Sequence, residues 1–587
     1  MRAKADFIVE AQETALAAFL QGLHATSLKK LAKVGHWGKY PGNVQRDFFN
    51  AVTFAREMGM EPYFIPVPVQ DDRGGKNAEM NVPIFPAHEW LATLHKHNRI
   101  EATLLGPGGA GEILTFWAET KNLTWSTEHP ARVEPGFPSK MLPFALFGDD
   151  ARIFEHEKLL IVTLRGVLNN VGSTLDRILL LGALPLDLCI PEITIDAWYE
   201  GHHWGFVHLL TGTWPVLDHL GEWIQPKHGK TRFQNAGKEL AGGLAGALVE
   251  TDGDYKFIKE TFHFEAYDNK ECCHRCGATK NFFDKHGHCS PVYTDFAPEA
   301  LHKKTSKTAA DYFTKHAHHL SPLSLIPGWV PQTTRIDIMH NVFQGGGLHL
   351  ASCVIITLLV AGRWGPMTLG WSMLLKLAWA DLKQFEKSIG VSTSQKRFTK
   401  SQLGYRKLND APKLQAKAFN CRVILAWLAH LTLKWTEAGH NTDTDQAMAV
   451  CCWAIADFIY VIESSDRHLT TEQAARAAAS GHKYLMSYSL LASLAVAQGS
   501  SMWPLKPKLH QFDHMLDDME RELLNPRHWW NFANEDFVGV IKRMAQKCSR
   551  KTLSLVTLKK YMLWVALHWM GRDRKVAGTI PCPKMRA

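Results

Sequence analysis

The sequence predicts a mixed α/β (α+β) protein, in which a mixed sheet is interrupted by a large all-helical insertion and preceded by a mixed N-terminal region. Two observations predict this class. Residues 140–260 hold three apolar β-type runs in quick succession, then a helical stretch and a fourth apolar run. Residues 345–525 instead show apolar positions at helical spacing and strong helix formers. A chain of 587 residues usually splits into several cores.

The N-terminal region, residues 1–135, combines several types of segment. HEWLATLHKHNRIEATLL (88–105) reads as a helix, because its apolar residues recur at helical spacing. QDDRGGKNAEMNVP (70–83) is polar and rich in turn residues, which predicts a loop.

Residues 136–344 contain the predicted sheet. The runs LPFALFG, KLLIVTLRGVL and DRILLLGALP have short connections and predict a three-stranded meander. The helical segment ITIDAWYEGHHWGFVHLLTGTW and the run LAGALVET follow, and TTRIDIMHNVF (333–343) is expected to form a fifth strand. The order β-β-β-α-β-α is that of the ribonuclease H-like fold, a mixed sheet with helices on both faces.

Residues 345–505 form the predicted helical insertion, and residues 506–587 return to the core. One segment, GGGLHLASCVIITLLVAGRWG, is apolar enough to suggest a membrane span. It carries His349 and Ser352 and its apolar stretch is short, so we expect a buried helix and no membrane partner.

Charge and cysteine content narrow the class of protein. The net charge of +9 and the pI of about 8.8 are compatible with a polyanionic partner. The 11 cysteines are odd in number and clustered, which suits a reducing compartment and a metal site rather than a secreted disulfide framework.

Three acidic residues far apart in the sequence each lie at the edge of a predicted element. Asp149 ends the first apolar run, Asp254 follows the fourth, and Glu535 lies in HWWNFANEDFVGVIKRMAQK at the start of an amphipathic helix. Magnesium prefers oxygen ligands, and two-metal phosphoryl transfer needs carboxylates that clamp ions about 3.5–4 Å apart. The pattern predicts an enzyme that cuts and joins DNA.

Each of these acids has a neighbour that could replace it. Asp149 is preferred because a glycine directly before it ends the apolar run. Acids at strand ends and helix starts are also common turn and cap residues, so the hypothesis depends on all three appearing in order. The alternatives are Asp150 for Asp149, Asp252 for Asp254, and Asp536 for Glu535.

Several motifs together resemble a known family. The motifs are FGDDARIF, TDGDYKFIKE, ECCHRCGATK, RIDIMHNVFQGG, KPKLHQFDHM and WWNFANEDFVGVIKR. In this order they resemble the DDE transposases with an interrupted ribonuclease H-like domain, above all the CACTA type and more distantly the hAT group. The resemblance covers roughly residues 140–345 and 500–550, and it places the third catalytic acid at Glu535.

The resemblance implies cleavage and strand transfer of double-stranded DNA at transposon ends, with Mg²⁺ or Mn²⁺ held by Asp149, Asp254 and Glu535. It also implies a homo-oligomer in the nucleus, with the N-terminal region as a candidate for DNA-end binding. Asp150 stands where the family usually has Gly, and Ile338 where it has Pro. A catalytically inactive, domesticated DNA-binding protein and a ribonuclease H-like nuclease therefore remain alternative hypotheses.

A Cys/His-rich stretch around 270–290 predicts a structural zinc site. Cys-x-x-Cys is a zinc-ligand spacing, since a tight turn lets both thiolates reach one ion. Reduced thiols in a core or loop would give the same pattern. The expected ligands are Cys273, Cys276 and His340, with His288 or Cys289 as the fourth and Cys272 as an alternative to Cys273.

Basic residues beside aromatic ones indicate DNA contacts. TSQKRFTKSQLGYRKLND interleaves cations with two aromatic residues, which suits a loop that follows a phosphate backbone, although a solvated loop between helices has the same composition. The two tryptophans before the third acid are candidates for stacking on a base, against a role in the core. The expected contacts are Lys396, Arg397, Lys400, Arg406, Lys407, Trp529 and Trp530, with Lys29, Lys30, Lys33 and Lys39 nearer the N-terminus.

Overall fold

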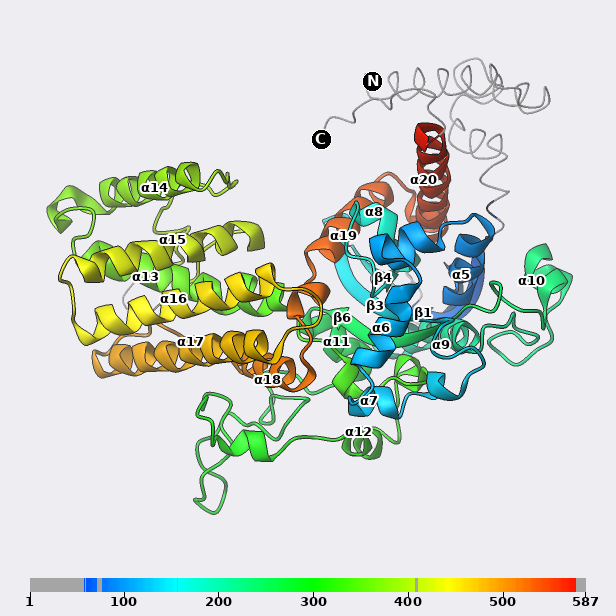
Figure 1. Ribbon diagram of the computed structural model, residues 1–587, viewed down its shortest axis with the longest axis horizontal. Helices are drawn as coiled ribbons and strands as arrows, with labels where there is room; N and C mark the ends of the chain where they lie inside the picture. The colour runs from blue at the N-terminus through cyan, green and yellow to red at the C-terminus, as the bar shows by residue number, and fades with distance from the viewer. Residues whose placement is uncertain (1–57, 59, 71–76, 156, 407–409, 577–587) are drawn as a thin grey trace.

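The computed structural model describes residues 58, 60–70, 77–155, 157–406 and 410–576. Their architecture is mixed α/β. A six-stranded mixed sheet has the strand order β1-β2-β5-β4-β3-β6. Helices lie around this sheet, and a separate stack of helices extends to one side of it (Figure 1).

The predicted meander is confirmed. Strand β3 (Met141–Arg152) pairs antiparallel with β4 (Lys158–Gly166), and β4 pairs antiparallel with β5 (Ile178–Pro185). The short helix α8 (Thr174–Arg177) lies in the second connection. Every residue of β5 is buried, as expected for a continuous apolar run covered on both faces.

The fourth predicted strand is also confirmed. After β5 the chain forms α9 (Ile193–Thr211) and α10 (Lys230–Asn235), and then enters β6 (Ala245–Gly253). Strand β6 lies parallel to β3 at the edge of the sheet and is buried along its whole length. A parallel pair needs a crossover connection, which α9 supplies.

The N-terminal part of the sheet differs from the expectation. Strand β1 (Tyr63–Gln70) pairs with β2 (Asn77–Ile84), so most of the predicted loop 70–83 is a strand. The polar residues of β2 are tolerated because the backbone pairing with β1 determines the conformation. The hairpin extends the sheet beside β5 and shares its buried core, so the described part of 1–135 has no core of its own.

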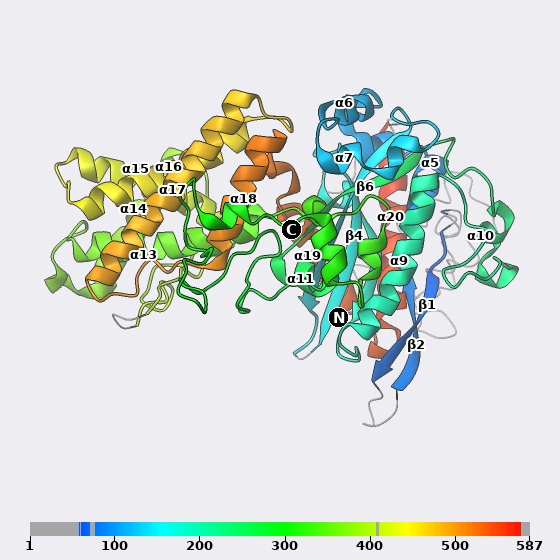
Figure 2. The ribbon, with the colours of Figure 1, turned by 90° about the horizontal axis from the view of Figure 1, so that it is seen from below.

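Helices cover the sheet on both faces (Figure 2). Helix α9 packs on β1 and β6, whereas α19 (Phe532–Ala545) packs on β3 and α20 (Leu553–Val576) on β2 and β5. The predicted helix 88–105 is α5 (Ala87–Lys96) followed by a π-helical turn at Glu101–Leu105. The smaller helices are α6 (Gly111–Glu119), α7 (Thr124–Thr127), α11 (Tyr255–Phe262) and α12 (Ala309–Lys315).

The predicted fifth strand, 333–343, is wrong. Thr334 makes one isolated parallel bridge to Thr251, and the chain then turns into the π-helical segment η9 (Met339–Gly346). The side chain of Asp337 accepts hydrogen bonds from the backbone N–H groups of Met339 and His340 at 2.9 and 3.0 Å. Such a bond pattern starts a helix, which is why the strand does not continue.

The helical insertion has a second buried core. It contains α13 (Gly347–Val360), α14 (Gly370–Ser388), α15 (Ala418–Glu437), α16 (Asp443–Ser464) and α17 (Thr471–Ala497). Helix α18 (Pro507–Glu522) packs into the same core, although it follows the predicted end of the insertion.

Two helical segments, Met339–Val360 and Asp443–Ser464, are long and apolar enough to cross a membrane by length and composition. Their apolar windows are 89% and 61% buried inside the structure. For α13 this burial agrees with the predicted buried helix.

Helix α11 lies very close to the ends of β3 and β6. Gly148 of β3 and Gly253 of β6 both face the ring of Phe257, and a Cβ atom at either position would overlap that ring. The missing side chains therefore allow Phe257 to hold the first turn of α11 against the two strands.

We expect Gly148→Ala to destabilise the protein by about 1–3 kcal/mol, because the added methyl group must displace Phe257 and with it α11. Urea unfolding of the full chain measures the loss. Gly111→Ala is the matched control, since a Cβ at that helix position meets no atom within 4 Å. Equal stability of the two variants would contradict the close contact.

Candidate active site

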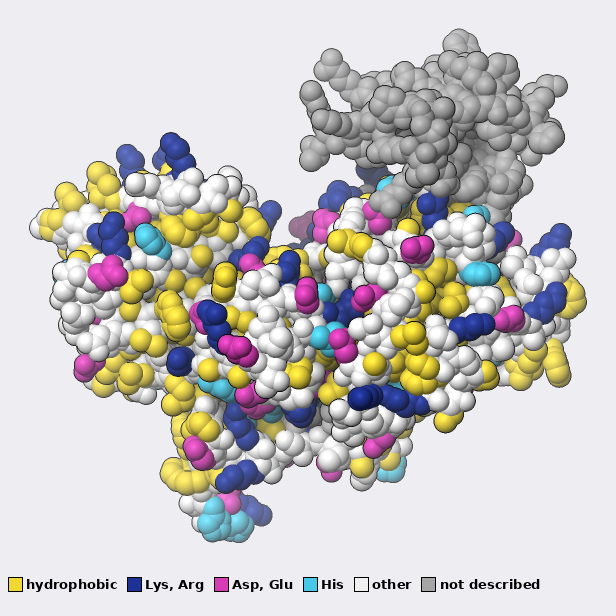
Figure 3. All heavy atoms as spheres, viewed as in Figure 1, with side chains coloured by type: hydrophobic (Ala, Val, Ile, Leu, Met, Phe, Trp, Pro, Cys, Tyr) yellow, Lys and Arg dark blue, Asp and Glu magenta, His cyan; other side chains and the backbone are white. Residues whose placement is uncertain are grey.

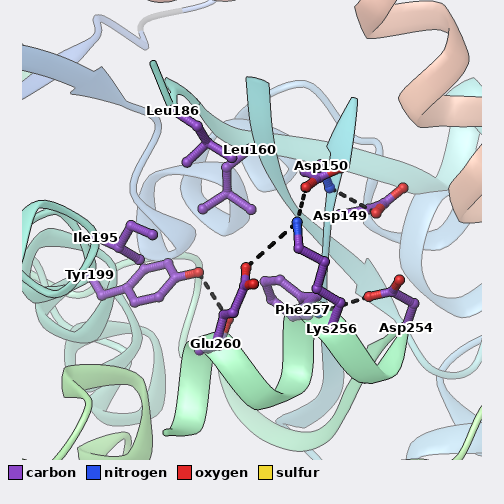
Figure 4. A pocket seen from close by; sticks show the side chains of 11 residues that line it. Asp149, Asp150, Leu160, Leu186, Ile195, Tyr199, Asp254, Lys256, Phe257 and Glu260 are labelled. Carbon is purple, nitrogen blue, oxygen red and sulfur yellow. Dashed lines mark hydrogen bonds and ion pairs between the residues drawn. The ribbon is translucent and has the colours of Figure 1, made fainter. Parts of the chain in front are cut away.

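Asp149 and Asp254 are neighbours because of the register of two parallel strands. Gly148 of β3 pairs with Gly253 of β6, and each aspartate directly follows its glycine. Parallel strands run to the same edge of a sheet, so the two carboxylates lie beside each other at that edge (Figure 4).

Both aspartates are held by backbone hydrogen bonds. Asp254 is the N-cap residue of α11, and its Oδ1 accepts a 2.7 Å bond from the N–H of Phe257. Asp149 Oδ1 accepts a 2.7 Å bond from the N–H of Asp150. Each carboxylate keeps its second oxygen for another partner.

Glu535 approaches the two aspartates from the first turn of α19. His340 of η9 lies between the acids, with its Nε2 3.5 Å from Glu535 Oε1 and its Nδ1 2.6 Å from Asp337 Oδ2. Asp337 is buried, and its Oδ1 also accepts the N–H of Asn531 at 3.0 Å, just before α19. Asp337 thus fixes His340 and the start of the helix that carries Glu535.

The acids affect one another's ionisation. Burial raises the pKa of Asp149 to about 8, and the charges of Glu535 and Asp254 act in the same direction. Burial also raises the pKa of Glu535, partly offset by the positive charge of His340. Burial lowers the pKa of His340, but the hydrogen bond and charge of Asp337 outweigh it and leave that pKa raised.

The structure separates the preferred acids from their alternatives. Asp150 is paired with Lys158 at 2.9 Å and with Lys256, and these two ammonium groups outweigh burial and lower its pKa. Asp252 is 1% exposed and bound to Arg165 at 2.6 Å. Asp536 faces solvent. The first two alternatives are already neutralised by cations, and the third points away from the core.

The three preferred acids provide a donor set suited to a hard divalent cation. All their ligand atoms are carboxylate oxygens, and magnesium takes such ligands while keeping several waters. Among the described groups of side chains, the oxygens of Asp149, Asp254 and Glu535 do not all lie within 4.8 Å of one another, so the three acids do not enclose a single ion. A pair of ions needs a wider spacing, because the ions themselves lie about 3.5–4 Å apart.

A second group of side chains forms a Cys₂His₂ cluster. The ligand atoms of Cys273, Cys276, His510 and His514 lie within 4.8 Å of one another, and all four residues are buried. Cys276 Sγ is 3.3 Å from the Nε2 atoms of both histidines. Two thiols and two imidazoles are the ligands of a closed zinc site.

The cluster differs from the predicted ligand set in its histidines. His510 and His514 lie one turn apart on α18, whereas His340 is engaged by Asp337 and Glu535. His288 and Cys289 are exposed at the tip of the Cys/His-rich stretch 270–290, which is called the insert below. The buried Cys272 donates to the carbonyl of Ala278 at 3.6 Å. The motif KPKLHQFDHM carries the H-x-x-x-H spacing that would have identified both histidines.

The predicted DNA contacts lie in two places. Arg397 and Lys400 stand over the rings of Trp379 and Trp371, with 5.5 and 4.6 Å to the ring centroids. Arg406 lies in the same loop, its backbone N–H bound to Asp410. Lys407 lies outside the described residues, as do Lys29, Lys30, Lys33 and Lys39.

The two tryptophans before α19 differ from each other. Trp529 is 7% exposed and its indole N–H donates to the carbonyl of Ile336 at 3.1 Å, so it packs in the core and offers no face to a base. Trp530 is half-buried, with the guanidinium of Arg527 over its ring at 5.5 Å.

No protein-family model matches this chain, and no curated protein matches it in sequence.

The raised pKa of Asp149 predicts a pH-dependent stability. The carboxyl ionises near pH 4 in the unfolded chain and near pH 8 in the fold, so the native state binds more protons between these values. The free energy of unfolding therefore falls as pH rises through this range. Asp149→Asn removes the effect, and each pKa unit corresponds to about 1.4 kcal/mol.

In buffer without divalent cations, we expect the stability of Asp149→Asn relative to the unaltered chain to increase by at least about 1 kcal/mol from pH 5 to pH 8. Denaturant unfolding at several pH values measures it. Asp536→Asn removes an exposed acid of the same region and should show no such trend. A constant difference for Asp149→Asn would mean that its carboxyl ionises normally in the fold.

Proposed function

We propose that this protein is a DDE-type transposase, which cleaves DNA strands at transposon ends and transfers them with the help of bound divalent metal ions. The single observation that carries the proposal is the register of β3 and β6, which brings Asp149 and Asp254 together beside Glu535. The motif-level resemblance and the charge of +9 support it.

The acids would hold Mg²⁺ or Mn²⁺. When bound, such ions ready the attacking oxygen and stabilise the leaving oxygen of a phosphodiester. Asp149 and Asp254 would hold the ions from the strand ends, and Glu535 from the opposite side. His340, kept in orientation by Asp337, would donate from its Nε2 to Glu535 and hold this carboxylate in place.

The finer fold assignment belongs to the same proposal. The meander β3-β4-β5, helix α9, the parallel strand β6 and helix α11 follow the order of a ribonuclease H-like core. The stack α13–α17 would be the insertion that separates the second acid from the third. The absence of the fifth strand among residues 333–343 is the main departure from that pattern.

The Cys₂His₂ cluster would hold a structural Zn²⁺. Its thiols and imidazoles suit zinc better than magnesium. The insert that carries the cysteines also contacts α18 through Arg275 and Asp518 at 2.6 Å. A metal there would fix the insert to α18, which leads through the 3-10 helix η11 (Pro526–Trp529) to α19 and Glu535.

Double-stranded DNA would lie along Lys396, Arg397, Lys400 and Arg406 on the insertion, and Trp530 remains a candidate for a base contact near Glu535. The homo-oligomer and the nuclear location expected of the family stay predictions.

One observation favours a non-catalytic DNA-binding protein as the second candidate. Asp150 stands where the family usually carries Gly, and it draws the ammonium groups of Lys158 and Lys256 next to Asp149. Positive charges there reduce the attraction of the site for divalent cations.

We expect the purified full chain to nick DNA that carries the ends of its element when Mg²⁺ is present. Asp254→Asn and Glu535→Gln should each lower the nicking rate at least about 100-fold, because each removes a negative ligand needed in the transition state. Denaturing gels of end-labelled DNA measure the rate.

Asp536→Asn is the matched control and should nick at the unaltered rate, since Asp536 is exposed beside Glu535. Nicking that survives Asp254→Asn would remove the mechanism. DNA binding by the unaltered chain without nicking in Mg²⁺ or Mn²⁺ would favour the second candidate. Nicking without strand-transfer joints would indicate a nuclease.

We expect the purified protein to contain one zinc ion per chain by elemental analysis. Cys276→Ser or His510→Gln should release it and destabilise the fold by about 3 kcal/mol or more, because structural zinc contributes directly to folding. Cys272→Ser is the control, since Cys272 lies next to the cluster but outside it. A zinc content unchanged by both ligand variants would contradict the assignment.

A further inference from the structure

A cavity of about 390 Å³ lies beside Asp254, on the side away from β4. The start of α11, η9, α13, the loop before α15 and the start of α18 all contribute to its wall. It therefore lies where the sheet and the helical insertion meet. On the face drawn in Figure 3, Lys and Arg side chains lie beside Asp and Glu side chains along this junction. The cavity has room for a group much larger than a water molecule.

Five lysines line this cavity: Lys256, Lys259, Lys413, Lys506 and Lys508. Lys256 is paired with Asp150 and Glu260. Among the described residues, none of the other four lysines forms an ion pair with a carboxylate. Asp254 is the acid that shares the cavity wall with them. The wall thus carries an excess of positive charge, which attracts an anion.

Lys508 is the most deeply placed of the lining lysines. Its Nζ donates a 2.8 Å hydrogen bond to the carbonyl of His340, and it reaches this position across Gly345. A Cβ at Gly345 would lie 2.8 Å from the Lys508 side chain. The structure therefore leaves room for an ammonium group directly beside the residue that contacts Glu535.

The cations of the cavity destabilise one another. Burial lowers the pKa of Lys508, and the charge of Lys413 lowers it further, whereas the charges of Asp254 and Asp337 act in the opposite direction. Burial lowers the pKa of His349 to about 4, and Lys413, Lys506 and Lys508 act in the same direction. An anion in the cavity would relieve this repulsion.

The N-terminus of α18 faces the same cavity. Lys506 is its N-cap residue and Pro507 its first residue, and both line the wall. The dipole of this 16-residue helix has its positive end here, which adds to the attraction for negative charge.

We propose that this cavity binds a backbone phosphate of the substrate DNA strand, next to the phosphodiester that is cut. The inference rests on the proposed function. The cavity is also continuous with the basic loop. The N–H of Lys413 donates to the carbonyl of Leu403 at 3.1 Å, and the N–H of Gln415 donates to the carbonyl of Gln402 at 2.7 Å. The loop of Lys400 and Arg406 thus leads along the protein to Lys413 and into the cavity.

The test uses the double variant Lys413→Gln/Lys506→Gln in the full chain, since both side chains are exposed at the rim and their loss should not affect folding. Binding of a 30-base-pair DNA duplex is measured at several salt concentrations without added divalent cation. Because a lost phosphate contact lowers the slope of log K against log salt by about 0.9, we expect the slope to fall by about 1 to 2.

The matched control is Lys230→Gln/Lys238→Gln, which removes the same charge from exposed positions around α10, on the far side of the sheet (Figure 1). Its slope should equal that of the unaltered chain. Equal slopes for the two double variants would overturn the proposal. Binding of ADP to the same proteins is the second measurement. ADP binding that the cavity variant loses, with an unchanged duplex slope, would also overturn the proposal, in favour of a site for a free nucleotide.

The outcome separates this inference from the proposed enzyme activity. A reduced slope together with no nicking by the unaltered chain in Mg²⁺ would support the phosphate site and reject the catalytic function. Nicking by the unaltered chain, together with equal slopes for the two double variants, would support the catalytic function and reject the phosphate site. No salt-dependent duplex binding by the unaltered chain would reject both.

Discussion

Three carboxylates that share one partly buried place repel each other, and the rest of the structure must hold them there. Burial raises the pKa values of Asp149 and Glu535, and the neighbouring carboxylates raise them further. Two devices oppose it. The backbone pairing of β3 with β6 fixes the two strand ends, and Phe257 locks α11 against them. Asp337 then joins η9 to the start of α19 and supplies a cationic neighbour through His340. Each device is a backbone or core contact, so the positions of the acids follow from the fold itself.

The helical insertion is tied to the sheet at both of its ends. At its start, η9 carries His340 toward Glu535. At its end, α18 carries His510 and His514 to the cysteines of the insert, and Arg335 binds Glu522 at 2.7 Å in the interior. The cavity lined by lysines lies between these two connections. These contacts hold the helical stack against the ends of β3 and β6, where the acids lie. The basic loop of the stack leads to the same ends of the sheet.

Much of this arrangement could be predicted from the sequence, and the errors have physical causes. Long apolar runs identified β3 to β6, and helical spacing identified α13 to α17, because burial alone determines those patterns. The polar segment of β2 is a strand only through its pairing with β1, which no local pattern reveals. The segment around Asp337 has strand-like composition, but one side chain that caps the backbone turns it into a helix. The sequence predicts that His340 joins Cys273 and Cys276, but in the structure it contacts Asp337 and Glu535. Separation along the sequence does not tell which of these groups a histidine contacts in the fold.

The Cys₂His₂ cluster joins side chains 234 positions apart in the chain. During synthesis, the ribosome must complete the whole helical stack before His510 emerges and the cysteines meet their partners. Glu535 emerges later still, so a nascent or truncated polypeptide has two aspartates at a strand edge without the third acid. The order of residues along the polymer thus postpones assembly of the acidic centre until the sheet and the whole helical stack have been synthesised.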